Sequence, residues 1–139
     1  MMLVSDYFMN MILDEKFRAQ SATAISAVYL GLFKAVPIEQ TASPASEVSG
    51  GAYARKQITF GTAAANARIL STAAIQFDLP TADWATASSP VVAVAVMDAS
   101  SSGNWLVAMP ICAMIIVKGQ PVPPIQIGGI KIGKLFGGC

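Results

Sequence analysis

The chain has 139 residues, of which 54% are apolar and 12% are charged, and its formal net charge is +1. This length suits one domain with a core of its own, and the near balance of charge gives no electrostatic case for nucleic-acid binding. Ordinary soluble domains carry about 25% charged residues, so the apolar excess predicts either a membrane location or a surface covered by neighbouring subunits.

The apolar runs do not favour the membrane. The longest of them, Trp105–Val117, is interrupted by Pro110, whereas a spanning helix needs about 20 apolar residues. Near the N-terminus, Asp6 and Asp14 break up any apolar stretch of a signal peptide. We therefore expect a protein that is made in the cytoplasm and that uses its apolar surface for assembly, with no membrane partner.

Residues 5–19 are predicted to form a helix, with Ser5 or Asp6 as its N-cap. A spacing of four residues produces a polar stripe made of Asp6, Asn10, Asp14 and Arg18. The opposite side carries Phe8, Met9 and Ile12. This apolar side is predicted to contact a neighbouring subunit, and the alternative is that it packs on the chain's own sheet.

The stretch that follows centres on residues 47–60. Val28–Phe33 is a predicted strand, and Pro37–Gly51 is a predicted long loop. Gly50 and Gly51 can adopt positive φ, so a chain reversal is expected there. An alternating run then predicts a strand at Tyr53–Phe60. We expect an architectural turn formed by Glu47, Gly50, Gly51, Tyr53 and Arg55.

The rest of the chain reads as short strands separated by turn residues. The predicted strands are Ile69–Phe77, Val91–Met97, Trp105–Met109, Ile111–Val117 and Ile125–Ile132, with a bulge or kink at Gly128-Gly129 in the last of them. Ile111–Val117 is either a separate strand or the bent continuation of Trp105–Met109 after Pro110. The fold class is therefore mainly β, an antiparallel β-sandwich or small barrel of about seven strands. It forms a single domain, with a helix at 5–19, a sandwich at 28–132 and a flexible tail at 133–139.

The residues argue against catalysis and metal binding. The chain contains no histidine, the commonest general base and metal ligand. Asp78 and Asp83 bracket a turn and are more typical of turn formers than of a carboxylate pair. Asp98–Asn104 is similar to a calcium loop, but the position of its bidentate glutamate is occupied by Met109. We expect a hairpin loop there, no cofactor, no metal and no enzymatic activity.

Four further side chains, two tryptophans and two cysteines, are assigned to the core or to the chain end. Trp84 and Trp105 are expected in the core, and stacking on sugar rings is the alternative. Cys112 lies in an apolar run and is expected to be buried. Cys139 ends the chain, where a free thiol is favoured over an intermolecular disulfide.

Several motifs, in a shared order, give the chain a resemblance to a known family. Residues 47–55, Glu-Val-Ser-Gly-Gly-x-Tyr-Ala-Arg, are followed by Phe60-Gly61, and further matching segments are Ser5–Tyr7, Val28–Phe33, Ala73–Phe77, Ala82–Trp84, Met97–Ala99 and Gly103–Leu106. Together they resemble small virion structural proteins of tailed bacteriophages, which include capsid decoration or cement proteins and so-called tail fibre proteins. The tail after Gly133 has no counterpart in this resemblance.

The resemblance implies a location in the virion and two possible functions. The first is a decoration or cement protein that stabilises the head through contacts with the major capsid protein and with its own copies. The alternative is a tail, fibre or adaptor component that recognises a host receptor, such as a glycan. In either case the partners are virion subunits and the protein is expected to be a homo-oligomer. Candidate subunit contacts are Phe8, Met9, Ile12, Leu135 and Phe136.

Overall fold

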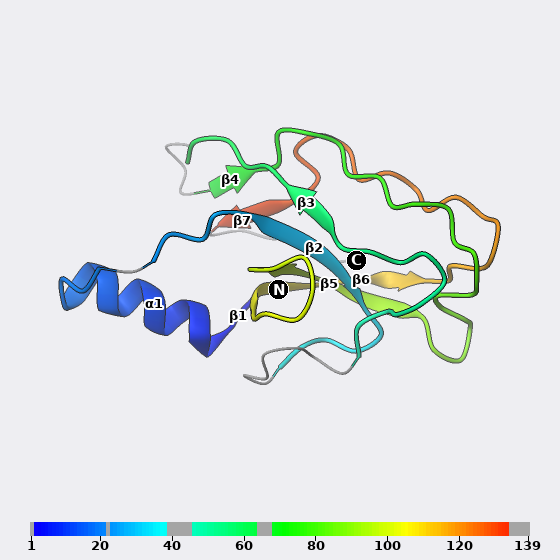
Figure 1. Ribbon diagram of the computed structural model, residues 1–139, viewed down its shortest axis with the longest axis horizontal. Coiled ribbons are helices and arrows are strands. Elements are labelled where there is room, and N and C mark those ends of the chain that lie inside the picture. The colour runs from blue at the N-terminus through cyan, green and yellow to red at the C-terminus, as the bar shows by residue number, and fades with distance from the viewer. Residues whose placement is uncertain (1, 22, 39–45, 64–67, 134–139) are drawn as a thin grey trace.

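A computed structural model describes residues 2–21, 23–38, 46–63 and 68–133. Over these residues the protein is mainly β, with one helix and seven strands in antiparallel sheets that do not close into a barrel (Figure 1). The elements are β1 (Leu3–Val4), α1 (Asp6–Phe17), β2 (Val28–Phe33), β3 (Lys56–Ile58), β4 (Arg68–Leu70), β5 (Val91–Met97), β6 (Trp105–Met114) and β7 (Lys131–Gly133). The predicted small sandwich is therefore confirmed.

The larger layer is a five-stranded sheet in the order β1-β6-β5-β2-β3. Its centre is β5, whose residues are all apolar and almost all buried, as the uninterrupted Val91–Met97 run predicted. It pairs with β2 on one side and with β6 on the other. Because both neighbours are hydrogen-bonded to it, β5 is the most enclosed strand of the molecule.

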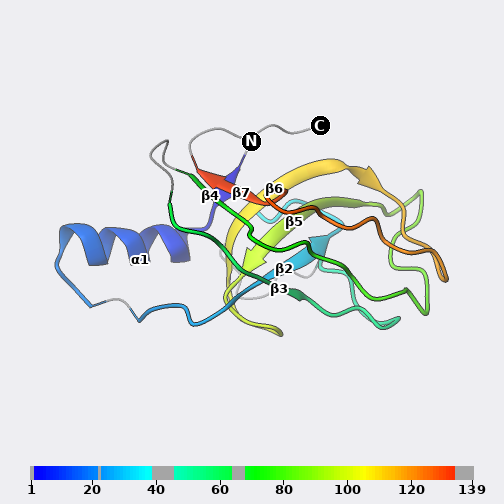
Figure 2. The ribbon, with the colours of Figure 1, turned by 90° about the horizontal axis from the view of Figure 1, so that it is seen from above.

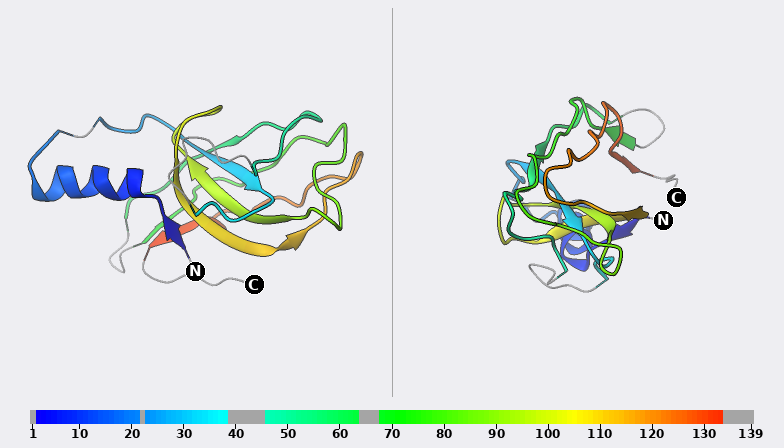
Figure 3. Two further views of the ribbon diagram at one scale, coloured as in Figure 1. Left: turned by 90° about the horizontal axis from the view of Figure 1, so that it is seen from below. Right: turned by 90° about the vertical axis from the view of Figure 1, so that its right-hand side faces the viewer.

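A second layer covers one face of this sheet. It contains the β4–β7 pair and two longer segments, 71–86 and 116–130, which are joined by isolated bridges between Ile75 and Ile125 and between Ala85 and Ile116. Figure 3 shows these segments running along the sheet, opposite β5 and β6. Between the layers lies the main core, which includes Leu30, Val96 and Trp84. This arrangement explains why so many apolar residues lie outside regular strands.

Three predicted strands are shorter in the structure than the sequence indicated. Tyr53–Phe60 contains β3 and one bridge residue, Ile69–Phe77 gives the end of β4 and two bridge residues, and Ile125–Ile132 contributes one bridge residue and part of β7. The glycine pair explains the last difference, because Gly128 has a φ of +73° and lies in a turn before the strand begins. Alternating apolar residues predict that one side of a segment is buried. An irregular extended segment can bury one side as a regular strand does, so the alternation did not distinguish the two.

The large sheet contains a strand that runs through a proline. Trp105–Met109 and Ile111–Val117 form one strand as far as Met114, which is the continuous alternative predicted from the sequence, and Pro110 lies opposite Ala93 within it. β1 pairs only with Val107 and Ala108, so Pro110 lies where β6 has no described neighbour on its outer side. A proline is tolerated there because no strand requires its missing amide donor.

The helix stands apart from both layers. Ser5 caps it, accepting a hydrogen bond from the Phe8 amide at 3.1 Å, as the sequence predicted. None of the helical residues is buried, and α1 contacts β6 next to its own start. Figure 2 shows the helix projecting to one side of the sandwich, with the chain returning from its far end to β2. It ends at Phe17, two residues before the predicted boundary.

Candidate interaction surfaces

The residues of the predicted turn gather around one buried ion pair. The Arg55 guanidinium binds the Glu47 carboxylate through two hydrogen bonds of 2.7 Å each, Nε to Oε1 and Nη2 to Oε2. The Arg55 side chain is 3% exposed and that of Glu47 is 15% exposed. Such a bidentate pair fixes the direction of both side chains as well as their separation.

Arg55 also holds a distant loop. Its Nη1 donates hydrogen bonds to the carbonyl oxygens of Ala99 at 2.7 Å and Ser102 at 2.6 Å. This loop joins β5 to β6, and Asp98 closes it by accepting hydrogen bonds from the Asn104 amide and side chain. The carboxylate that suggested a calcium loop is therefore used within the hairpin.

Tyr53 completes the cluster. Its hydroxyl donates to Glu47 Oε1 and accepts from the Leu32 amide of β2, both at 2.9 Å. Burial raises the pKa of this phenol well above its ordinary value, so it remains a neutral donor. Burial alone would lower the pKa of Arg55, but the hydrogen bonds and charge of Glu47 outweigh it, and that pKa is raised.

The glycine pair forms the turn that the sequence indicated. Gly50, Gly51 and Ala52 have φ values of +74°, +57° and +64°. The Gly51 carbonyl accepts a hydrogen bond of 2.8 Å from the Trp84 indole, and a Cβ on Gly51 would lie only 2.9 Å from that nitrogen. Trp84 in turn packs edge-on against Tyr53. The turn is thus fitted to the second layer of the sandwich.

The cluster has no unpaired polar group among the residues that the structure describes. Each polar group of Glu47, Tyr53 and Arg55 considered above is already engaged within the chain, and no buried side-chain nitrogen or oxygen of the described residues lacks a partner. Beside it lies an open polar depression of about 400 Å³, which the exposed serines 100–102 help to line. The arrangement can fasten the 98–104 hairpin to the 47–55 segment.

The other polar residues singled out in the sequence are separated from one another. Asp78 pairs with Lys56 at 2.6 Å, and Asp83 accepts from the Lys118 amide at 2.8 Å. Among the described residues, no group of three or more acidic or cysteine side chains could hold a metal ion. Trp84 and Trp105 are 1% and 3% exposed, so both lie in the core and neither offers a face to a sugar ring.

The helix presents more apolar surface than its predicted face. Phe8 packs against the main core and Ile12 is half-buried, whereas Met9 is 41% exposed. Sequence analysis missed Leu13 and Phe17, which are 43% and 81% exposed. The sequence signal that could have found them is the interval of four residues from Met9 to Leu13 and from Leu13 to Phe17, because it places the three on one line along the helix. Of the other predicted contacts, Leu135 and Phe136 lie outside the described residues.

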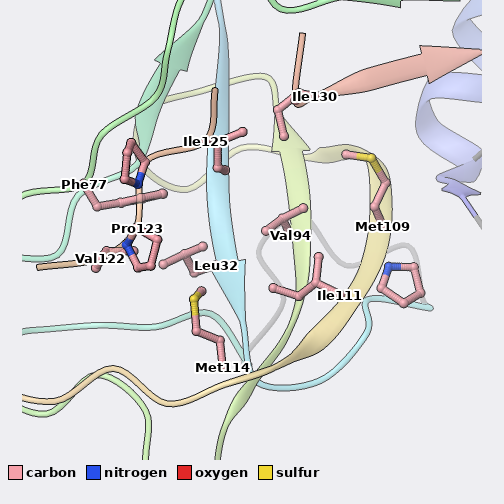
Figure 4. Close-up of a pocket in the computed structure, with 13 residues that line it drawn as sticks. Leu32, Phe77, Val94, Met109, Ile111, Met114, Val122, Pro123, Ile125 and Ile130 are labelled. Atoms are coloured by element: carbon pink, nitrogen blue, oxygen red, sulfur yellow. The ribbon is translucent and has the colours of Figure 1, made fainter. Parts of the chain in front are cut away.

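An apolar groove opens between the two layers (Figure 4). It has a volume of about 360 Å³, and Leu32 and Val94 form its floor on the large sheet. The remaining lining comes from the 71–86 segment, from β6 and from the segment before β7: Phe77, Met109, Pro110, Ile111, Met114, Val122, Pro123, Pro124, Ile125, Gly129 and Ile130. None of the lining residues is charged. Pro123, Pro124 and Gly129 are exposed and mark the opening to solvent.

The expectation of a buried Cys112 is wrong. Its side chain lies exposed near the end of β6, beyond the part of the strand that the core encloses, and it is not a free cysteine. An apolar neighbourhood in sequence did not imply burial, because alternate residues of an edge strand face outward. Cys139 lies outside the described residues.

Comparison with known proteins gives one finding. A family model described as "Podophage GP4 fiber I protein gp80" matches residues 3–133, and no curated protein matches the chain. The matched range contains every strand and the helix. In the part of the chain that the structure describes, no helix is long and apolar enough to span a membrane.

Proposed function

Because the chain belongs to the family of the podophage GP4 fiber I protein gp80, we propose that this phage virion structural protein is a subunit of a fibre. The observation that carries the proposal is the family match across residues 3–133. The resemblance to tailed-phage virion proteins is confirmed at that level. Between the two functions predicted from the sequence, the family description favours the fibre component over capsid decoration.

The structure supports a function based on contacts between subunits. Eight large apolar side chains are exposed on the described residues: Tyr7, Met9, Leu13, Phe17, Ile38, Leu79, Ile115 and Ile127. Four of them, Tyr7, Met9, Leu13 and Phe17, belong to α1. Subunits that stay together permanently bury large apolar interfaces. The partners are therefore further virion subunits, including copies of this chain.

The proposed contribution is structural and non-enzymatic. The polar cluster formed by Glu47, Tyr53 and Arg55 is occupied by its own hydrogen bonds. Metal analysis of the purified protein is expected to find no stoichiometric zinc or calcium, and incubation with host glycans is expected to give no cleavage. Either a bound metal or a released sugar would overturn this part of the proposal.

Locating the protein on intact particles tests the fibre proposal. Antibodies raised against the purified chain, detected with gold in electron micrographs, are expected to label the fibres. Particles from a phage lacking the gene are the control and should show neither the label nor the fibre. Labelling spread over the faces of the capsid would contradict the proposal and favour decoration through the major capsid protein.

A further inference from the structure

Two apolar surfaces of the chain are left open to solvent. The first is the α1 ridge, defined as Met9, Leu13 and Phe17, which are 41%, 43% and 81% exposed. The second is the apolar groove between the layers, of about 360 Å³. Exposed apolar patches of this kind mark interaction sites on soluble proteins.

The ridge is a geometric match for a groove. Residues at i, i+4 and i+8 lie along one side of a helix, over about 12 Å. Helices that bind grooves use anchors at such spacings, with the apolar side laid into the cleft. Phe17 is the most exposed apolar residue described and ends the helix. A large aromatic side chain at the tip supplies most of the apolar area of such an anchor.

The groove has the complementary character. None of its lining residues is charged, so it would leave a carboxylate or an ammonium group without a partner. Two of its residues, Met109 and Met114, are only half-buried, and methionine side chains adapt to the shape of an incoming group. Ile127 lies between the lining residues Ile125 and Gly129 and is 69% exposed, which adds apolar surface next to the opening.

Among the described residues of one copy, the ridge meets neither the groove nor another apolar surface that would bury it. The helix is fixed at its start, because β1 pairs with β6 and the Ser5 amide donates a 2.9 Å hydrogen bond to Leu106. From there it projects beyond the sandwich (Figures 1 and 2). The ridge therefore remains exposed on the same molecule that carries the groove.

We propose that the α1 ridge of one copy inserts into the apolar groove of a second copy. The choice of a second copy rests on the proposed function as an assembly subunit, and every copy then supplies one ridge and one groove. Such a contact is heterologous, so repetition gives either a closed ring or an open filament. When the ring closes at two copies, both contacts join the same pair of subunits and their buried areas add toward the about 800 Å² per partner of a stable interface.

Complementary variants of the purified full-length chain test the contact. The helix variant is Leu13→Glu with Phe17→Glu, and the groove variant is Met114→Glu. Each is expected to dissociate the oligomer in sedimentation experiments, with a dissociation constant raised at least about thirtyfold, as expected for losing an interface hot spot. Leu79→Glu is the matched control, since Leu79 is 55% exposed and belongs to neither surface.

A cross-linking experiment decides which surfaces meet. A photoreactive benzoylphenylalanine replaces Phe17 in the groove variant, and this chain is mixed with an isotopically labelled helix variant. The groove variant retains a helix that can insert, and the helix variant retains an intact groove. Cross-links from position 17 to residues 109–130 of the labelled chain are expected.

Several results would overturn the proposal. They are a wild-type chain that stays monomeric, cross-links from position 17 to the partner's helix, and cross-links within one chain only. If Met114→Glu fails to fold, Ile127→Glu at the exposed rim takes its place. These experiments use purified protein and no particles. A negative result would therefore refute the contact between ridge and groove without refuting the proposed location on fibres, which the gold labelling tests separately.

Discussion

At the scale of single residues, one ion pair organises the segments that the regular strands do not. Glu47 and Arg55 lie eight positions apart, and their contact draws in the hairpin after β5 through Ala99 and Ser102. The pair is protected from water, which strengthens its hydrogen bonds and makes the loss of either partner costly. The cluster therefore holds the 98–104 hairpin against the 47–55 segment.

Replacing Arg55 with methionine tests how much the Arg55 hydrogen bonds stabilise the fold. The change leaves the Glu47 carboxylate and two carbonyl groups without their donor, so the free energy of unfolding is expected to fall by about 3–5 kcal/mol. The control is Lys56→Met, next in the sequence, because the Lys56–Asp78 pair is 26% and 60% exposed and such pairs contribute at most about 1 kcal/mol. Chemical denaturation measures both, and equal losses would contradict the assignment.

The two glycines of the turn are expected to differ in their tolerance of a side chain. Valine at either position is predicted to cost about 1–3 kcal/mol, since both have positive φ. A Cβ on Gly50 would meet nothing within 4 Å, whereas one on Gly51 would lie 2.9 Å from Ala82 and from the Trp84 indole nitrogen. Alanine at Gly51 should therefore lower the melting temperature more than alanine at Gly50.

A control for this comparison exists elsewhere in the chain. Gly119 has a φ of +76° and, like Gly50, would place a Cβ in open space. Gly119→Ala should match Gly50→Ala, because both carry only the backbone cost of the left-handed region. If Gly51→Ala proved no worse than these two, the fit of the turn against Trp84 would be wrong.

At the scale of elements, α1 is the part least supported by the rest of the chain. It has 12 residues, a length at which an isolated helix is marginal in water. No residue of it is buried, so its stability within one copy rests on Phe8, on the Ser5 cap and on local pairs such as Arg18–Asp14 at 2.8 Å. Local opening of such an element does not require the sandwich to unfold.

Replacing Ser5 with alanine is expected to open the helix alone. An N-cap of this kind contributes about 1 kcal/mol, and Ser5 is 2% exposed, so water does not readily replace it. Hydrogen exchange should become faster for the amides of α1 and stay unchanged for those of β5. Ser26→Ala, at an exposed position in the segment before β2, is the control, and faster exchange in β5 would show that the helix and sandwich unfold together.

At the scale of the whole molecule, the described chain is a sandwich with a projecting helix, which carries the α1 ridge, and an apolar groove. A chain with 12% charged residues has little polar surface with which to stay apart from its neighbours. In a virion this composition is suitable, because subunits meet at high local concentration and remain assembled. The family match and the exposed apolar residues lead to the same view of its function.

The C-terminal residues give a prediction at this scale. Gly133, the first residue of the predicted tail, belongs to β7 and pairs with Arg68 of β4, and residues 134–139 lie outside the described residues. Deleting 134–139 is expected to lower the incorporation of the chain into particles, because Leu135 and Phe136 are predicted subunit contacts. The deletion also removes Cys139, the second cysteine of the chain, and Cys112 is not free, so the melting temperature of the deletion is compared with that of Cys139→Ser and is expected to match it. Denaturation curves and quantitative immunoblots of purified particles measure the two effects.

Two narrower changes serve as controls for the deletion. Leu135→Ser with Phe136→Ser should reproduce the loss of incorporation, whereas Cys139→Ser alone separates the loss of the cysteine from the loss of the apolar side chains. A deletion that unfolds the isolated chain, or one that leaves incorporation intact, would exclude the predicted contact.

The sequence by itself determined the features that depend on neighbours along the chain. The Ser5 cap, the glycine turn and strands β2 and β5 were predictable because capping, positive φ and continuous burial are local properties. The mainly β class followed from the same signals. Only the tertiary structure decided that Arg55 binds the 98–104 hairpin, that Cys112 is exposed and that Leu13 and Phe17 face solvent. These outcomes depend on which distant segments come together, and no local pattern of residues fixes that choice.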